Sequence, residues 1–520
     1  MIISGDQVTR NEEIQADVCV IGSGCGGSVV ARELSEAGHS VVVLEEGGHY
    51  TREDYGTWRP SKSMNILYRE NGALPALGIG DTPNIYLLVG KCVGGSSLVN
   101  GGVCWRTPER VLVDWRDRLG ISELTLEAMD RAFDRVESEL QVGRVPEHLH
   151  NEGVRRLQAA ALRKGWSGRA LDRNVVDCDA CCRCLFGCPH DAKRSVLVTY
   201  LESAQSFGTR IYSDCRAEKI IRKGNRILGV RARVIDRRTG IGLHHLRVRS
   251  EIVVLAAGSI HTPLVLMKNR LARKSGQVGR NLTVHPSARV YARFDDPIDP
   301  WKGSFQSYAI EEFRPEGIQL INIYPSPSIV LGTMGGFGVQ ARQDAERVRH
   351  IGAFGGMISD VSTGRVRPGF GWNPLVTYRM LPQDKAKFLR ALRLVGELWF
   401  EAGAREIYLP MPDPAIMTRP DQLDRIDPDK IQASRIECGA QHPLGTCRMG
   451  IEPKQSVVGP WGQVHGLEGL YIADGSVVPT SVAVNPQITI MAMATRIAWR
   501  LAETNLGRSS GSSRHVGSFG

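Results

Sequence analysis

The stretch GSGCGG at 22–27 has glycines at the three positions that matter in a dinucleotide-binding loop. Gly22 would allow a tight turn, Gly24 would let the backbone approach a pyrophosphate, and Gly27 would permit close packing of a helix on a strand. Glu45 follows where an acidic side chain accepts hydrogen bonds from an adenosine ribose. The pattern predicts a dinucleotide site and leaves both FAD and NAD open.

A second glycine-rich stretch, VGKCVGGSSLVNGGVCW at 89–105, is expected beside a ligand as well. Its small residues would let the backbone lie flat against a bulky planar group, next to the Asn100 amide. The alternative is an ordinary loop, although so dense a glycine cluster requires some close approach to explain it. The cofactor-binding candidates in this stretch are Gly94, Gly95, Ser96, Asn100 and Gly101.

Five of the 12 cysteines lie between 178 and 188, and four of them have the spacing of a metal-binding motif. Zinc is one interpretation, either with thiolates alone or with His190 in place of one. A second is an iron–sulfur cluster, because the run fits the bacterial ferredoxin pattern C-x2-C-x2-C-x3-C-P. Reduced or disulfide-linked structural cysteines are a third. The four candidate ligands are Cys178, Cys181, Cys184 and Cys188.

The first glycine loop is expected inside a strand–helix–strand unit. Residues 17–21 form an apolar, β-branched run that predicts a buried strand. Apolar residues then recur at helical spacing up to Gly38, which stands where a helix would end. Residues 41–44 predict the second strand, and Glu45 follows it directly.

A further buried strand is expected at 251–255. It follows a set of antiparallel strands between 219 and 249, with a hairpin turn at Gly224-Asn225. Packed beside the first strand, it would bring Ala257 and Gly258 close to the cofactor's phosphates. The two glycine loops and this strand end are therefore expected at one site.

The composition argues against two classes of protein, those that bind nucleic acid and those that span a membrane. The chain has 520 residues and a net charge of +10, yet its arginines are scattered and no basic block is interleaved with aromatics. We therefore expect no nucleic-acid binding. No run approaches the ~20 apolar residues of a membrane span, and residues 1–15 lack the apolar core of a signal peptide. The expectation is a cytoplasmic protein without a membrane span.

Six stretches occur in the order typical of one known family. They are GSGCGG with Glu45, GKCVGGSSLVNGG at 90–102, LAAGSIHTP at 255–263, VGRNLTVHP at 278–286, HPLGTCRMG at 442–450 and GLYIADGSVVPTSVAVNPQITIMAMA at 469–494. With them the chain resembles the glucose-methanol-choline (GMC) oxidoreductases, which are FAD-dependent alcohol oxidases and dehydrogenases. The resemblance favours FAD over NAD. It is nearest the cholesterol oxidase and long-chain alcohol oxidase branch, because Asn485 stands where other members have a second histidine.

The resemblance implies oxidation of a CH–OH group of a small-molecule alcohol to an aldehyde or ketone. Hydride would pass to the flavin while the hydroxyl proton leaves to a base with a pKa near neutrality. His442 is the family's position for that base, and Asn485 would bind the substrate oxygen beside it. Asp474 and Gly475 correspond to the family's FAD contacts.

Asn485 and Pro486 also have the pattern of a helix start. Asn at the N-cap and Pro at the first helical position predict a helix over 487–503. Such a helix would point its positive end at the flavin and stabilise negative charge on the reduced ring. Asn485 is either a cap only or both a cap and a catalytic residue, and Pro486 is a further cofactor-binding candidate.

The resemblance implies a mixed α/β chain with an FAD-binding Rossmann-type domain and a second, antiparallel-sheet substrate domain. The expected boundaries are 1–294 and 436–506 for the two parts of the FAD-binding domain and 295–435 for the substrate domain, with a disordered tail at 507–520.

Within the expected substrate domain, strands are predicted at 319–323, 352–358 and 375–380, and a helix at 384–402. These elements would form a sheet that covers the flavin.

The cysteine segment bears on the electron acceptor. Without a cluster, reduced flavin could pass electrons to dioxygen. With one, as in sugar dehydrogenases of the family that share the context of CLFGCPHDAK at 184–193, electrons could leave singly to a quinone or cytochrome. Two other classes stay open: a non-catalytic electron-transfer protein built on flavin and 178–188, and a nicotinamide-dependent dehydrogenase without flavin.

Overall fold

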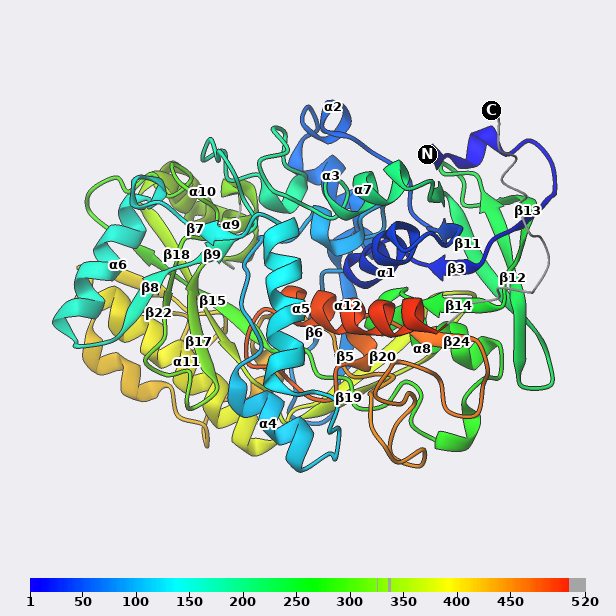
Figure 1. The fold of residues 1–520 in the computed structure, drawn as a ribbon. Coiled ribbons are helices and arrows are strands. Elements are labelled where there is room, and N and C mark those ends of the chain that lie inside the picture. Colours follow the sequence, from blue (N-terminus) through cyan, green and yellow to red (C-terminus); the bar gives the residue numbers. More distant parts are fainter. Residues whose placement is uncertain (325, 335–337, 505–520) are drawn as a thin grey trace, which may run out of the picture.

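The computed structural model describes residues 1–324, 326–334 and 338–504, and the predicted tail at 507–520 lies outside them. Two large sheets organise the described chain. A parallel sheet lies on the right of Figure 1, and a larger, mostly antiparallel sheet extends from the left to the centre, where helices α5 (Leu126–Glu139) and α12 (Gln487–Glu503) are seen. The predicted mixed α/β fold is confirmed.

The parallel sheet has six strands, and every neighbouring pair is parallel. Its central strands are short runs of Val, Ile, Leu and Cys that are buried along their whole length, as expected of strands covered on both faces. The order across the sheet is β1 (Ile2–Ile3), β10 (Arg210–Tyr212), β4 (Val41–Leu44), β3 (Val18–Ile21), β14 (Ile252–Leu255) and β24 (Leu470–Ile472).

Helices close around this sheet. The predicted helix after the glycine loop is α1 (Cys25–Glu36), and it packs against α12 and α7 (Tyr200–Ser206), while α12 packs against α5 (Figure 1). None of the described helices has the length and apolar composition needed to cross a membrane. The remaining helices are α2 (Arg52–Tyr55), α3 (Pro60–Leu67), α4 (Glu109–Asp117), α6 (Glu152–Arg163), α8 (Gly258–Lys268), α9 (Pro327–Thr333), α10 (Gly338–Glu346) and α11 (Pro382–Glu401).

The predicted antiparallel strands form a separate four-stranded sheet. β11 (Cys215–Lys223) and β12 (Arg226–Ile235) pair as a hairpin around the expected turn, and β13 (Gly242–Arg249) continues the sheet. β2 (Glu12–Gln15) adds a parallel strand at the edge. β14 then returns beside β3 in parallel register, as predicted.

The large sheet has twelve strands. β17, β18, β20 and α11 lie within two residues of their predicted bounds, but strands before 295 and after 435 belong to the same sheet. Its main path is β19 (Thr363–Pro368), β20 (Pro374–Arg379), β5 (Leu74–Gly78), β6 (Ile85–Leu87), β23 (Cys438–Ala440), β15 (Ser287–Arg293), β18 (Ile351–Ile358), β17 (Ile318–Asn322), β16 (Tyr308–Ile310) and β8 (Gly168–Ala170); β21 (Glu406–Tyr408) pairs with β15 and β22 (Ile416–Met417) with β21. A two-stranded sheet joins β7 (Gly143–Arg144) to β9 (Asp172–Arg173).

The close packing of α1 on β3 gives the first prediction. A Cβ at Gly27 would lie 2.0 Å from the Gly22 carbonyl oxygen and 3.0 Å from the Ala256 Cβ. Gly27→Ala should therefore lower the free energy of unfolding by about 1–3 kcal/mol, which is measured as a lower melting temperature. Gly143→Ala is the control, because no atom lies within 4 Å of the added Cβ. Equal melting temperatures for the two variants would contradict this packing.

Candidate active site

Three neighbouring strands of the parallel sheet end side by side, and the loops after them carry predicted cofactor-binding residues. Gly22 follows β3, Ala257 lies two residues after β14, and Asp474 lies two residues after β24. Parallel strands present their carboxyl ends at one edge of a sheet, where α/β proteins bind nucleotides. Here the loops line a cavity of about 190 Å³.

Most of the predicted cofactor residues line this first cavity, and four do not. Gly27 packs against the end of β3 instead. Gly94 lines neither this cavity nor the second cavity, which is described below. Asn100 and Gly101 line that second cavity. The predicted residues in the first cavity are Gly22, Gly24, Glu45, Gly95, Ser96, Ala257, Gly258, Asp474, Gly475 and Pro486, and His442 lines it as well.

Two of these glycines leave room for a ligand. A Cβ added at Gly24 would meet only the Gly95 Cα, at 4.0 Å, and one added at Gly258 would meet no atom within 4 Å. Gly22 differs, because its φ of +104° and the Ala256 carbonyl oxygen 2.3 Å from an added Cβ both require glycine there. The wall is therefore bare backbone where a dinucleotide would lie.

Glu45 lines the cavity, but its carboxylate is already hydrogen-bonded. It accepts from the backbone and hydroxyl groups of Ser23, at 3.0 and 2.8 Å, and from the Gly47 backbone at 2.8 Å. Glu46, which the sequence analysis missed, lies beside it and pairs with Arg69 at 2.8 Å. Burial alone would raise the pKa of Glu46, but Arg69 and Lys91 lower it to about 2. A carboxylate and a guanidinium therefore both border this end of the cavity.

Asp474 joins two of the loops that form the cavity wall. Its carboxylate accepts hydrogen bonds from the Gly258 backbone at 2.9 Å, the Thr262 hydroxyl at 2.5 Å and the Ser476 backbone at 2.8 Å. Burial raises the pKa of Asp474, and these hydrogen bonds oppose that shift. Hydrogen bonds to this one carboxylate thus hold the loop after β14 and the loop after β24 together.

Two buried cations that the sequence analysis missed support the second glycine-rich stretch. Lys193 donates to the backbone carbonyls of Leu98 and Asn100, both at 2.8 Å, and to that of Cys184 at 2.7 Å. Arg173 donates to the Gly101 carbonyl at 2.9 Å. These bonds fix the carbonyls of the stretch, whose residues Gly90 and Gly95 line the first cavity and Gly101 and Gly102 the second.

A second cavity of about 400 Å³ adjoins the first. Seven residues line both cavities: Cys25, Leu88, Ser96, Gln441, His442, Pro486 and Ile490. The second is lined largely by apolar side chains from the large sheet and its loops, including Tyr291, Phe305, Ile321, Ile323 and Met357. His442 therefore lies where a nucleotide-type cavity meets an apolar one.

The structure brings His442 and Asn485 together, although 43 residues separate them in the chain. The Asn485 Nδ2 lies 3.2 Å from the His442 Nε2, and the Asn485 Oδ1 is buried without a hydrogen-bond partner. Burial lowers the pKa of His442 to about 4, so the imidazole is neutral at neutral pH and can accept a proton. This pKa lies below the predicted value near neutrality, because burial desolvates the imidazole.

The prediction that Asn485 caps α12 is wrong. The helix begins at Gln487, its N-cap is Pro486, and no side chain makes the capping hydrogen bond. The Asn485 amide is directed to His442 instead. The helix N-terminus does border the site, because Pro486, Gln487 and Ile490 line the second cavity.

His285 is a site residue that the sequence analysis quoted within a motif but did not assign. Its Nδ1 lies 3.3 Å from the His442 Nδ1, and its ring is fully buried. Burial and the neighbouring His442 hold the pKa of His285 well below its usual range. Asp360 accepts hydrogen bonds from the backbone N–H groups of Val284 and His285, at 3.0 and 3.2 Å, and so fixes this turn. The only sequence signal was the motif VGRNLTVHP itself.

The cysteine segment does not form the predicted four-thiolate site. Across the described ranges, the one group of three or more potential metal ligands with atoms within 4.8 Å of one another is Asp179, Cys181 and His190. Cys178, Cys184 and Cys188 are outside it, and Cys184 instead lies 3.2 Å from the Arg173 guanidinium. The iron–sulfur interpretation therefore receives no support.

Comparison with known proteins agrees with this architecture. Two GMC oxidoreductase family models match residues 62–287 and 365–494, and a NAD(P)-binding Rossmann-like model matches 20–67. The chain is 37% identical over 503 residues to an uncharacterized GMC-type oxidoreductase of Mycobacterium tuberculosis, covering 96% of this chain and 77% of that protein.

Two further similarities extend this result. A long-chain-alcohol oxidase of Arabidopsis thaliana is 28% identical over 551 residues, covering 97% of this chain and 69% of that protein. The solved structure of pyridoxine 4-oxidase from Mesorbium loti has a TM-score of 0.72 at 17% identity and covers 94% of this chain and 99% of that one, so the fold is shared. The chain belongs to the GMC oxidoreductase family.

Proposed function

We propose that this chain is an FAD-dependent oxidoreductase that oxidises the CH–OH group of an apolar alcohol to an aldehyde or ketone, with His442 as the base. The observation that carries the proposal is the position of His442. Its neutral imidazole lines both cavities, and its Nε2 lies next to a buried amide.

GMC oxidoreductases bind FAD, and the first cavity has the backbone lining that a dinucleotide needs. The loops at Gly22–Gly24 and Ala257–Gly258 would hold the pyrophosphate, with Glu45 or Glu46 near the adenosine ribose and Asp474 near the ribityl chain. Ser96, Gly101 and Asn100 would border the flavin ring. When bound, FAD would supply the acceptor for the hydride that leaves the alcohol carbon.

Residues of the chain itself would accept the hydroxyl proton and hold the substrate oxygen. A neutral His442 with its lone pair on Nε2 takes the hydroxyl proton as the C–H bond breaks, and the Asn485 amide holds the substrate oxygen in place. With Nε2 as acceptor, the His442 Nδ1 would carry the hydrogen and would donate to the His285 Nδ1, 3.3 Å away. His285 therefore acts as a positioning residue that selects the tautomer of the base.

The N-terminus of α12 would add electrostatic stabilisation. The first turn of this helix borders the second cavity through Pro486, Gln487 and Ile490. Helix N-termini carry partial positive charge, which favours the anionic form of a group placed there. Gln487 also accepts a hydrogen bond from the Asn100 amide, so the helix start is tied to the glycine-rich wall.

The lining of the second cavity supports an apolar substrate. Aromatic and aliphatic side chains predominate, and they would bind a hydrocarbon portion by excluding water from both surfaces. Ile321, Ile323 and Met357 supply part of this lining from the region 295–435, which we propose as the substrate domain. The oxidase activity named for the Arabidopsis relative supports dioxygen as the electron acceptor. If dioxygen is the acceptor, hydrogen peroxide should form in step with oxygen uptake. A separate electron-transfer partner as the acceptor would give no such peroxide.

His442→Ala tests the assignment of the base. Turnover of an apolar alcohol should fall about 10²–10⁴-fold, because general-base catalysis is lost, while FAD stays bound. The measurements are steady-state oxygen uptake and the flavin absorption of the desalted protein. Unchanged turnover by a fully flavin-loaded variant would refute the role of His442.

The pH dependence of turnover tests whether burial lowers the pKa of His442. Since the base must be unprotonated and burial lowers the pKa of His442 to about 4, kcat should stay constant between about pH 8 and pH 6. It should decrease only as the pH falls towards 4. A midpoint near 6.5, the ordinary histidine value, would contradict the desolvated environment described here.

His285→Gln tests the positioning role. Loss of the Nδ1 partner should lower kcat at least about tenfold and alter the pH profile, because the tautomer of His442 is no longer fixed. His150→Gln is a matched control, since His150 is also buried but lines neither cavity. If the variant instead loses activity only in proportion to the loss of folded protein, and its pH profile is unaltered, His285 has a structural role only.

A further inference from the structure

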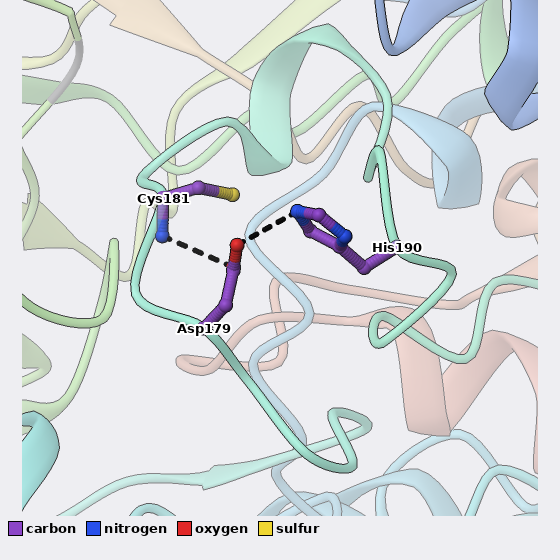
Figure 2. A group of neighbouring side chains, drawn as sticks. All are labelled: Asp179, Cys181 and His190. Atoms are coloured by element: carbon purple, nitrogen blue, oxygen red, sulfur yellow. Dashed lines mark hydrogen bonds and ion pairs between the residues drawn. The ribbon is translucent and has the colours of Figure 1, made fainter.

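The loop between Val175 and Lys193 contains a group of side chains that the proposed reaction does not use. A bridge between these two residues closes the loop at its base. Asp179 and Cys181 come from its first half and His190 from its second, and Figure 2 shows the three side chains directed towards one another. The group lines neither of the two cavities described above.

The geometry of this group is that of a set of metal ligands. One ligand atom from each side chain lies within 4.8 Å of the others. The His190 Nε2 lies 2.7 Å from an Asp179 carboxylate oxygen, and the other Asp179 oxygen accepts a hydrogen bond from the Cys181 backbone at 3.3 Å. The side chains of His190 and Asp179 are 54% and 44% exposed, so an ion could enter from solvent and keep a water ligand.

The contacts within the group do not explain the conformation of the loop. A solvent-exposed ion pair such as Asp179–His190 contributes at most about 1 kcal/mol. The loop meanwhile holds Ala180 and Cys182 at φ of +61° and +54°, each of which costs about 1–2 kcal/mol for a residue with a Cβ. These two residues flank Cys181 in the chain, and Figure 2 shows the Cys181 side chain directed towards the pair. A bound ion would offset that cost.

We propose that Asp179, Cys181 and His190 bind one Zn²⁺ ion, with water in the fourth position. One imidazole, one thiolate and one carboxylate form a donor set that suits zinc and excludes Ca²⁺ and Mg²⁺, which prefer oxygen ligands only. Cys181 binds as the thiolate, so its proton is released to solvent when the metal enters. The site differs from the four-thiolate arrangement that the cysteine spacing indicates.

The proposed ion would act on the loop and not on the reaction, because its ligands line neither cavity. The same loop carries Lys193, which donates to the Leu98 and Asn100 carbonyls behind the second glycine-rich stretch and to the Cys184 carbonyl within the loop. It also carries Leu185, which lines the second cavity. A metal that ties Asp179 and Cys181 to His190 joins the two halves of the loop opposite its closed base. The ion therefore stiffens the support of the glycine-rich wall without touching the reacting atoms.

Cobalt titration of the purified, metal-stripped protein tests the proposal. One Co²⁺ should bind per chain and give a thiolate-to-cobalt charge-transfer band with intense visible bands of a four-coordinate site, and Zn²⁺ should displace it. Cys181→Ser should lose the charge-transfer band, whereas Asp179→Asn and His190→Gln should weaken binding at least about tenfold. Zn²⁺ should raise the melting temperature of the wild type but not of these variants.

Cys178→Ser and His148→Gln are the matched controls, because they remove a nearby thiol and an exposed imidazole outside the group. Both should bind Co²⁺ like the wild type. Absence of stoichiometric binding would overturn the proposal, as would a charge-transfer band that survives in Cys181→Ser but disappears in Cys178→Ser. If Cys181→Ser does not fold, the two exposed variants at Asp179 and His190 decide, and wild-type affinity in both would overturn the site.

Discussion

The site depends on the hydrogen bonds of one buried carboxylate, Asp474. Strands β3, β14 and β24 bring three loops to the same edge of the parallel sheet, but the strands do not fix the loops relative to one another. Asp474 fixes the loops after β14 and β24 to each other by accepting from the Gly258 backbone, the Thr262 hydroxyl and the Ser476 backbone. The C-terminal segment, which supplies His442 and Asn485, is thereby joined to the start of α8, next to β14.

Desolvation then determines the chemistry available at this edge. Burial keeps His442 neutral, and the adjacent His285 and Asn485 occupy opposite sides of its ring. One ring nitrogen is engaged with another buried histidine, while the other faces an amide with an unpaired oxygen. In the proposed reaction, the neutral imidazole would accept the hydroxyl proton and the neighbouring amide would bind the substrate oxygen.

The local elements could be predicted from the sequence, and much of their assembly could not. The unit β3–α1–β4 follows from apolar periodicity and glycine spacing, which are properties of neighbouring residues. The pairing of His285 with His442 depends on tertiary packing, as does the use of Lys193 to hold backbone carbonyls. Asn485 has the residue type of a helix cap, but tertiary contact turns its amide to His442. The cysteine spacing gave no information on side-chain direction or on the positive φ angles of Ala180 and Cys182, which flank Cys181.

The central claim is that a cofactor in the first cavity and an alcohol in the second meet at His442. The most direct measurement is the anaerobic absorption spectrum of the FAD-loaded protein before and after addition of a long straight-chain primary alcohol. The flavin spectrum is expected to bleach when the alcohol is added, because hydride from the alcohol carbon would reduce the flavin. A protein that takes up no FAD, or a bound flavin whose spectrum is unaffected by primary and secondary apolar alcohols alike, would contradict it.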